Sequence, residues 1–171
     1  MLKPTPFFIL LLAVSLTFGI TLQQAYQQAG PGLGYDRVLF LHPDSTYTGG
    51  LTISDEKVAI KGFGALIDLA GDTLYVTGNS QIDLDGCVII NGYAGLFIQG
   101  LVVSRISQCT FYGHQYGILI KTASTSIQVY NTILANNSKY GFACEKGTER
   151  HLEYIDAYQN IQGNYVEWCP G

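Results

Sequence analysis

The chain has 171 residues, enough for one domain, and carries a net charge of −4 with only 13% charged residues. Its nine lysines and arginines are scattered along the sequence and form no basic stripe, so nucleic acid is not expected as a partner.

Residues 1–19 have the composition of a secretory signal peptide. Lys3 supplies the positive start, and residues 7–18 form an apolar run. Thr17 and Gly19 are small enough for a cleavage site. The alternative is a membrane anchor, but a run of about 12 residues is shorter than the roughly 20 that a spanning helix needs. We therefore predict a secreted or cell-surface protein with no membrane span after signal removal.

Residues 20–34 are predicted to form a capping helix and a turn. Apolar residues between Leu22 and Ala29 have the i, i+3, i+4, i+7 spacing of a short amphipathic helix. The Gly- and Pro-rich residues 30–34 end this helix. The first rung of a solenoid otherwise exposes an apolar face and unpaired strand edges, so we expect the helix to cap the repeat that follows. A partner-binding helix is the less favoured alternative.

Pairs of mostly apolar residues spaced by two recur along the rest of the chain at steps of 22 to 25 residues. A spacing of two is a strand signature, because successive side chains of a strand point to opposite faces. The three series are Leu51/Ile53, Leu74/Val76, Leu96/Ile98, Ile118/Ile120, Phe142/Cys144 and Val166/Trp168; Val58/Ile60, Ile82/Leu84, Ser104/Ile106, Ile127/Val129 and Leu152/Tyr154; and Cys87/Ile89, Cys109/Phe111, Thr132/Leu134 and Ala157/Gln159. Three short strands per repeat describe one turn of a coil whose strands stack in parallel. We predict an all-β fold, a single-stranded parallel β-helix (solenoid) of about five to six rungs over residues 35–171.

The residues between the predicted strands agree with this fold. Glycine and asparagine, including Gly113, Gly141 and Asn131, fall where a corner needs unusual backbone angles. Proline is absent from Leu51 to Cys169, as interior parallel ladders require.

Several segments resemble the right-handed parallel β-helix proteins of the pectin-lyase-like group. Residues 21–30 followed by 36–53 resemble the leading segment of exported bacterial members, with Pro43-Asp44-Ser45-Thr46-Tyr47 in place of the usual Pro-Gly-x-Tyr turn. Residues 129–144 (VYNTILANNSKYGFAC) resemble one of the family's rungs, and residues 153–171 resemble a late rung. The resemblance implies a right-handed coil and export. It does not imply one activity, because such a scaffold hosts many functions.

The end of the sequence has two interpretations. No cap comparable to the N-terminal helix follows Trp168, and the final rung resembles an internal one. We therefore favour a β-helix that is incomplete at its C-terminal end, with missing rungs or another subunit covering it. In the alternative, Trp168 together with Pro170 and Gly171 closes the coil.

The four cysteines allow three disulfide connectivities. Cys87 and Cys109 are 22 residues apart at equivalent positions, and parallel side chains in register give poor disulfide torsions, so we predict free thiols stacked in the core. Cys144 and Cys169 are 25 residues apart, and Cys144 aligns with Trp168, so one thiol is expected to point inward and the other outward. A bridge between them is the less favoured outcome. Zinc is not expected, because the chain has no Cys-x-x-Cys pair.

Outward positions between the inward pairs form columns across the rungs. The second series gives the column Ala59, Asp83, Arg105, Gln128 and Glu153, and the next column is Lys61, Asp85, Ser107 and Tyr130. A ladder of surface charges is the favoured interpretation, since exposed pairs on adjacent strands contribute about 1 kcal/mol or less. The alternative is a saccharide-binding strip, in which Arg105 contacts a uronate carboxylate while Asp83 or Glu153 contacts hydroxyls or Ca²⁺.

The first series gives an apolar outward column. Its members are Thr52, Tyr75, Phe97, Leu119, Ala143 and Glu167. Exposed apolar rows usually pack against something, so we expect a loop, another subunit or further sequence to cover this one. The alternative is a platform for sugar rings, with Tyr75 and Phe97 as its aromatic side chains.

Two functional hypotheses follow. The first is a non-catalytic exported domain that binds polysaccharide or a surface partner without cofactor or metal; its candidate binding residues are Tyr75, Phe97, Arg105, Tyr130 and Glu153. The alternative is a polysaccharide lyase acting on acidic glycans, with Asp83, Asp85 and Arg105 as catalytic candidates and Ca²⁺ as its metal. The lyase requires these three side chains to converge in a groove. A hydrolase is not expected, because His114 has no aspartate at matching positions on adjacent rungs.

Overall fold

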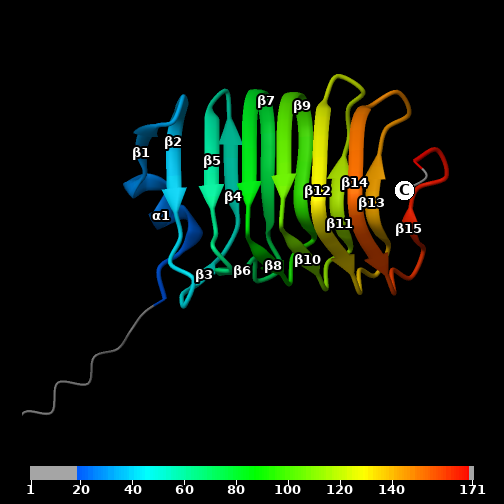
Figure 1. Ribbon diagram of the computed structural model, residues 1–171, viewed down its shortest axis with the longest axis horizontal. Helices are drawn as coiled ribbons and strands as arrows, with labels where there is room; N and C mark the ends of the chain where they lie inside the picture. Colours follow the sequence, from blue (N-terminus) through cyan, green and yellow to red (C-terminus); the bar gives the residue numbers. More distant parts are fainter. Residues whose placement is uncertain (1–18, 170–171) are drawn as a thin grey trace, which may run out of the picture.

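Parallel strands stack into a β-solenoid of about six turns in the computed structural model, which describes residues 19–169. Fifteen strands join one continuous sheet that wraps around the coil (Figure 1). Helix α1 lies at one end of the coil and the C-terminal residues lie at the other. The predicted fold class is confirmed. The predicted signal peptide, residues 1–19, lies outside the described residues except for Gly19.

Each turn of the coil contributes strands to three faces. Four long strands bend around a corner and belong to two faces each: β7 (Thr73–Asp85), β9 (Ala94–Ser107), β12 (Ser126–Ala135) and β14 (Glu149–Tyr158). The polar face consists of β2 (Tyr35–Phe40), β5 (Lys57–Lys61), the second parts of β7 and β9, and the first parts of β12 and β14. The aromatic face consists of β4 (Leu51–Ser54), the first parts of β7 and β9, β11 (Tyr116–Ile120), β13 (Tyr140–Cys144) and β15 (Gly163–Tyr165). The third face consists of β3 (Thr46–Thr48), β6 (Leu66–Asp68), β8 (Val88–Ile90), β10 (Thr110–Tyr112) and the second parts of β12 and β14.

The predicted inward pairs fill the core of the coil up to the last rung, where Tyr154, Gln159 and Trp168 are exposed instead. In the first series Leu74 pairs in parallel with Leu51 on one side and Leu96 on the other, and Leu96 in turn pairs with Ile118. All four side chains are at most 2% exposed. Burying one leucine or isoleucine side chain stabilises a fold by about 1.5–3 kcal/mol, so the stacked rows supply the main driving force for the coil.

Strands β7 and β9 turn the corner between the aromatic and polar faces at two stacked glycines. Gly78 pairs with Gly100, and their φ angles are 69° and 152°. A Cβ atom on Gly100 would lie 2.5 Å from the carbonyl oxygen of Gly78, so no side chain fits there. Glycine at both positions lets these strands bend while their ladder continues unbroken.

Helix α1 (Leu22–Gln28) covers the first rung, as predicted. The Gln24 backbone N–H donates to the Thr21 hydroxyl at 3.0 Å, and the Thr21 N–H donates to the Gln24 side chain at 2.9 Å, so both ends of a capping box are present. Leu22 is fully buried in the core. Strand β1 (Gly30–Gly32) then pairs antiparallel with β2, a hairpin that was not predicted. Within residues 19–169, no helix is long and apolar enough to cross a membrane.

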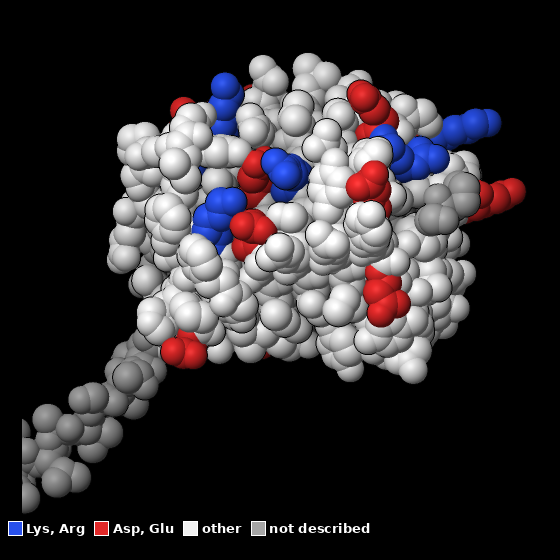
Figure 2. All heavy atoms as spheres, viewed as in Figure 1, with Lys and Arg blue, Asp and Glu red and all other residues white. Residues whose placement is uncertain are grey.

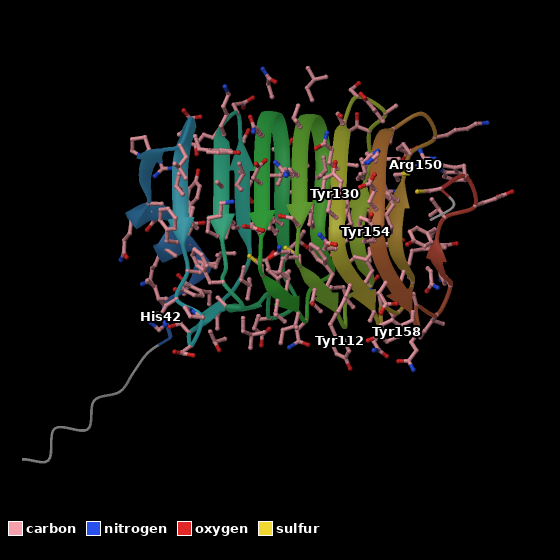
Figure 3. The ribbon with its side chains drawn as sticks, in the orientation of Figure 1. His42, Tyr112, Tyr130, Arg150, Tyr154 and Tyr158 are labelled. Carbon is pink, nitrogen blue, oxygen red and sulfur yellow. The ribbon has the colours of Figure 1, made fainter. Side chains whose placement is uncertain are left out.

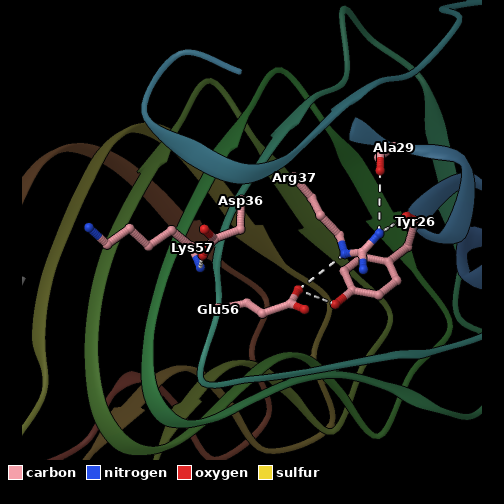
Figure 4. Close-up of polar contacts among 6 residues, drawn as sticks. All are labelled: Tyr26, Ala29, Asp36, Arg37, Glu56 and Lys57. Atoms are coloured by element: carbon pink, nitrogen blue, oxygen red, sulfur yellow. Dashed lines mark hydrogen bonds and ion pairs between the residues drawn. The ribbon is translucent and has the colours of Figure 1, made fainter. Parts of the chain in front are cut away.

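A polar network fastens α1 to the first two rungs (Figure 4). Arg37 forms an ion pair with Glu56 at 3.2 Å and donates to the Ala29 carbonyl at 3.3 Å. Its guanidinium also lies 4.6 Å from the centre of the Tyr26 ring. The Tyr26 hydroxyl donates to the same Glu56 carboxylate, and burial together with this bond raises the pKa of Tyr26. These contacts fix the helix against the coil through side chains from α1, β2 and the loop before β5.

The strand register shifts in the last rung. Val129 pairs with Leu152, whereas the prediction paired it with Tyr154. Tyr154 instead occupies a corner, with a φ of 55° and an exposure of 81%. The same corner in the preceding rung holds Asn131, which adopts such angles more readily than tyrosine, so the residue types concealed the corner. Two further predicted pairs are wrong in the same rung: Leu134 pairs with Ala157 instead of Gln159, and Phe142 pairs with Tyr165 instead of Val166.

Candidate functional site

A hollow of about 510 Å³ lies on the polar face, and we call it the polar hollow. It contains five of the predicted site residues: Asp83, Asp85, Arg105, Tyr130 and Glu153. The remaining residues around it are Lys61, Leu84, Ser107, Gln108, Asn131 and Tyr154. Acidic and basic side chains lie next to one another over β5, β7 and β9 (Figure 2), and Tyr130 and Tyr154 lie together over β12 and β14 (Figure 3).

The parallel register explains why residues so far apart in sequence meet here. Asp83 pairs with Arg105, and Ser107 pairs with Tyr130, so outward side chains of successive rungs stack next to one another. Glu153 pairs with Tyr130 and not with Gln128, which corrects its predicted column. The shift of the last rung therefore places Glu153 in the column that contains the tyrosine.

The two aspartates of the polar hollow are held by neighbouring groups. Asp85 accepts from the Lys61 ammonium at 3.3 Å and from the Ser107 hydroxyl at 2.7 Å. Asp83 accepts from the Tyr35 hydroxyl at 2.5 Å. Burial raises the pKa of Tyr35 to about 12, and the bond to Asp83 adds to this shift. The contact between Tyr35 and Asp83 joins residues 48 apart and was not predicted, because no periodic signal connects them.

Arg105 differs from Lys61, the other cation of the polar hollow. Among residues 19–169 the ion pairs involve Arg37, Lys61 and His151, so the exposed guanidinium of Arg105 has no carboxylate partner. It lies 6.0 Å from the centre of the Tyr130 ring. An arginine offers planar donors that match a carboxylate, so this group is free to bind one from a ligand.

A second group of side chains borders the hollow on its C-terminal side. The His151 ring lies 5.6 Å from the Tyr130 ring, and His151 Nε2 lies 2.8 Å from the Glu153 carboxylate. Glu153 therefore has one oxygen engaged by histidine and one available for hydrogen bonds from a ligand.

Tyr75 and Phe97 lie in a different place from the polar hollow. Their rings are 5.1 Å apart at an angle of 47°, in a separate hollow of about 600 Å³ on the aromatic face. The two hollows share no residue, so the structure does not bring these rings together with Arg105, Tyr130 and Glu153.

Part of the apolar outward column is covered by the coil's own side chains. Leu119 and Ala143 are 3% and 5% exposed, and the rings of Tyr116 and Tyr140 pack against them. Val166 also packs against them and takes the position in the column that was predicted for Glu167. Glu167 itself is exposed. No loop or second subunit is needed to bury this part of the column.

His114 belongs to a buried ladder at one corner of the coil. The Gly92 N–H donates to its Nδ1 at 2.8 Å, so Nε2 carries the proton and donates to the Ile89 carbonyl at 3.0 Å. Burial lowers the pKa of His114 to about 4, so the ring is neutral at physiological pH. The ladder continues through Asn137 and Asn160, whose side-chain oxygens accept from the backbone N–H groups of His114 and Asn137 at 3.1 Å each. The step of 23 residues between its members was the signal that could have revealed it.

The cysteines occupy two places in the core. Cys87 and Cys109 are at most 1% exposed on adjacent rungs, and their thiols donate to the carbonyls of Asp85 and Ser107 at 3.7 and 3.2 Å. Cys144 and Cys169 are also both buried, so the expectation that one of them points outward is wrong. A turn after β15 carries Cys169 back into the core. All four are free thiols in this structure.

The polar hollow offers one unpaired cation, an aromatic ring and several hydrogen-bonding groups. Within residues 19–169, no three His, Cys, Asp or Glu side chains gather as ligands for one metal ion. Asp83, Asp85 and Arg105 do line the same hollow, but the aspartates are engaged by Tyr35, Lys61 and Ser107. The arrangement therefore suits binding of a polar ligand better than removal of a proton from it.

Sequence comparison agrees with the observed coil. A family model described as a right-handed beta helix region matches residues 46–167. The chain therefore belongs to the right-handed β-helix family. The searches of the curated proteins and of the solved structures each returned no match. The family accounts for the scaffold, and the function has to be argued from the side chains on its faces.

Proposed function

We propose that this chain is an exported, non-catalytic β-helix domain that binds an acidic polysaccharide in the polar hollow. The observation that carries the proposal is the position of Arg105, a guanidinium without a carboxylate partner among the described residues, in a hollow with Tyr130 and Glu153. The signal-like composition of residues 1–19 and the resemblance to exported pectin-lyase-like proteins support export.

The surrounding groups fit the parts of a uronic-acid unit. Arg105 can bind the carboxylate through two parallel N–H donors. The Tyr130 ring offers an apolar surface for the C–H groups of a sugar ring, and its half-buried position limits the entropy lost on binding. Glu153 and the Asn131 amide supply acceptors and donors for hydroxyl groups. A volume of about 510 Å³ lies within the usual range for ligand sites of roughly 300–1,000 Å³.

The occupied state of the aspartates supports binding without catalysis. A lyase that uses Ca²⁺ needs a base next to carboxylates that bind the ion, and the ion neutralises the carboxylate of the substrate. Here both Asp85 oxygens accept hydrogen bonds from Lys61 and Ser107, and Asp83 accepts from Tyr35. The lyase remains the alternative, because Asp83, Asp85 and Arg105 line one hollow as it requires.

Calorimetric titration tests the proposal. Oligogalacturonate or alginate oligomers are added to the purified chain, with a neutral oligosaccharide as the comparison. Arg105→Ala is expected to weaken binding of the acidic oligomer about 10- to 100-fold, because hydrogen bonds to charged groups contribute roughly 1.5–3 kcal/mol. Lys146→Ala is the matched control, since it removes an exposed cation outside the polar hollow and should leave the affinity unchanged.

Two outcomes would contradict the proposal. Equal weakening by Arg105→Ala and Lys146→Ala would mean that binding depends on overall charge and not on the hollow. Appearance of unsaturated product absorbance, with or without Ca²⁺, would favour the lyase. Export is tested separately by the mass of the protein recovered outside the producing cell, which should lack residues 1–19 or nearly so.

A further inference from the structure

The C-terminal turn brings two thiols together at the end of the coil. Strand β13 ends at Cys144, whose side chain points inward. Strand β15 stops at Tyr165, and a turn closed by the Cys169 N–H donating to the Val166 carbonyl at 2.9 Å returns the chain to the core. Cys144 and Cys169 are 5% and 0% exposed and belong to the same core cluster, and each thiol shifts the pKa of the other. The two thiols therefore lie close together in the core at this end of the coil.

Other contacts hold this turn in place independently of the thiols. The Trp168 indole N–H donates to the Cys144 carbonyl at 2.8 Å. The Arg150 guanidinium donates to the Trp168 carbonyl at 2.6 Å. The residue before Cys169 is thus fastened to β13 and β14, which keeps the sulfur of Cys169 close to that of Cys144.

The cysteines in the middle of the coil provide a contrast. Cys87 and Cys109 immediately precede β8 and β10, and the neighbouring residues Val88 and Thr110 pair in parallel. Their side chains are therefore held in register, which gives poor disulfide torsions. Cys169 belongs to a turn and not to a ladder, so its backbone can adjust to the geometry that a disulfide requires.

We propose that Cys144 and Cys169 are an oxidisable pair whose disulfide staples the C-terminal turn to the last rungs, while Cys87 and Cys109 stay reduced. The oxidant is a small-molecule disulfide. The Cys144 thiolate attacks one sulfur of that disulfide and releases one thiol. Cys169 then loses its proton and attacks the Cys144 sulfur of the mixed disulfide, which releases the second thiol. Two protein thiols are oxidised and one external disulfide is reduced to two thiols.

The surroundings favour Cys144 as the attacking group. Cys144 lines a hollow of about 220 Å³ together with Tyr140 and Trp168, next to the C-terminal turn. The adjacent Cys169 thiol, together with the charge of Arg150, lowers the pKa of Cys144 to about 7. The adjacent Cys144 thiol and burial raise the pKa of Cys169. A thiolate with a pKa near neutrality attacks disulfides well at mildly alkaline pH.

Thiol counting with peptide mapping tests the proposal. The full chain is incubated with mixtures of oxidised and reduced glutathione, alkylated, and digested for mass spectrometry. Two of the four thiols should disappear, and one cross-linked peptide pair should contain Cys144 and Cys169. Four remaining thiols under strongly oxidising mixtures, or a cross-link between Cys87 and Cys109, would overturn it.

A thermal melt provides the second measurement. The disulfide closes a loop of 25 residues (169 − 144 = 25), so the oxidised protein should melt on the order of 5–10 °C higher than the reduced one. Cys169→Ser should abolish the difference between oxidised and reduced samples, whereas Cys109→Ser should retain it. An unchanged difference in Cys169→Ser would contradict the proposal even if the variant is less stable than the parent, because only the effect of oxidation is compared.

Discussion

The two ends of the coil close their cores differently. At the N-terminal end, α1 covers the first rung, and Leu22 on its inner side is fully buried. At the C-terminal end, β14 forms ladder bonds with β12 alone among the described strands, so its other edge is unpaired. Its inward residues Leu152 and Ile155 are only half-buried.

The same positions one rung earlier show what the difference means. Val129 and Thr132 pair with Leu152 and Ile155, and they are 0% and 1% exposed. The strand register is the same in both rungs. The exposure of Leu152 and Ile155 therefore reflects the lack of a covering layer and not a wrong residue type at these positions. Strand pairing fixes which side chains point inward, whereas burial depends on what lies on the next layer.

Truncating one leucine at each end measures this difference, and the largest effect is expected at the capped end. Leu22→Ala should lower the free energy of unfolding by about 3–4 kcal/mol, because it leaves a cavity between α1 and the first rung. Leu152→Ala should cost about 1–2 kcal/mol, since part of that side chain already contacts water. Urea unfolding followed by circular dichroism gives both values. Equal losses would contradict the contrast between the ends and would indicate that Leu152 is covered in solution.

The buried ladder at His114 predicts the next largest effect, a loss of stability in acid. The unfolded chain takes up a proton on histidine near pH 6.5, but His114 in the folded chain does so only near pH 4. Protons therefore favour unfolding in this window, and stability rises as the pH increases from about 4 to about 6.5. Below this window the loss is about 3 kcal/mol. Unfolding curves measured across the window test the sign and the size.

Replacing His114 with the residue type found at the other ladder positions distinguishes its contribution to acid sensitivity from that of other titratable groups. His114→Asn places the residue type of positions 137 and 160 at the same corner and should flatten the stability curve between pH 4 and 6.5. His42→Asn is the control, because His42 is an exposed histidine outside the ladder that forms no ion pair with residues 19–169. A flat curve in the parent protein, or an equal change in the control, would contradict the assignment to the interior ladder.

Most of the coil could be predicted because its signal is periodic. The apolar pairs repeat at the step set by one turn, so the stacked rows around Leu74 and Leu96 could be aligned without a structure. The alignment failed at Tyr154, where a bulky residue with a positive φ angle occupies a corner that asparagine fills one rung earlier. A strand pattern reports apolarity at alternate positions but not the backbone angle of a corner. The predicted alignment of β14 was therefore displaced by two residues.

The candidate site was predictable to the extent that it follows the same ladder. Asp83 and Arg105 are one repeat apart and were placed side by side, whereas Glu153 was misaligned with the last rung. The contact between Tyr35 and Asp83 crosses two rungs. The spacing of residues in the sequence cannot predict a contact that depends on how far one side chain extends. Spacing alone also could not show that Tyr75 and Phe97 line a different hollow from Arg105. Only the folded coil shows which column of outward residues lies on which face.

The smallest predicted effect concerns the network that ties the cap to the coil. Tyr26→Phe removes the hydroxyl that donates to Glu56 but keeps the ring next to the Arg37 guanidinium. The loss of one partly exposed hydrogen bond to a carboxylate should lower the free energy of unfolding by about 1 kcal/mol. Hydrogen exchange should also become faster in α1 and not in β14, because only the capped end is loosened. Tyr112→Phe, an exposed tyrosine whose hydroxyl has no hydrogen bond to residues 19–169, is the control and should change neither measurement. Faster exchange at both ends would mean that the cap and the open end unfold as one unit, which would remove the distinction between them.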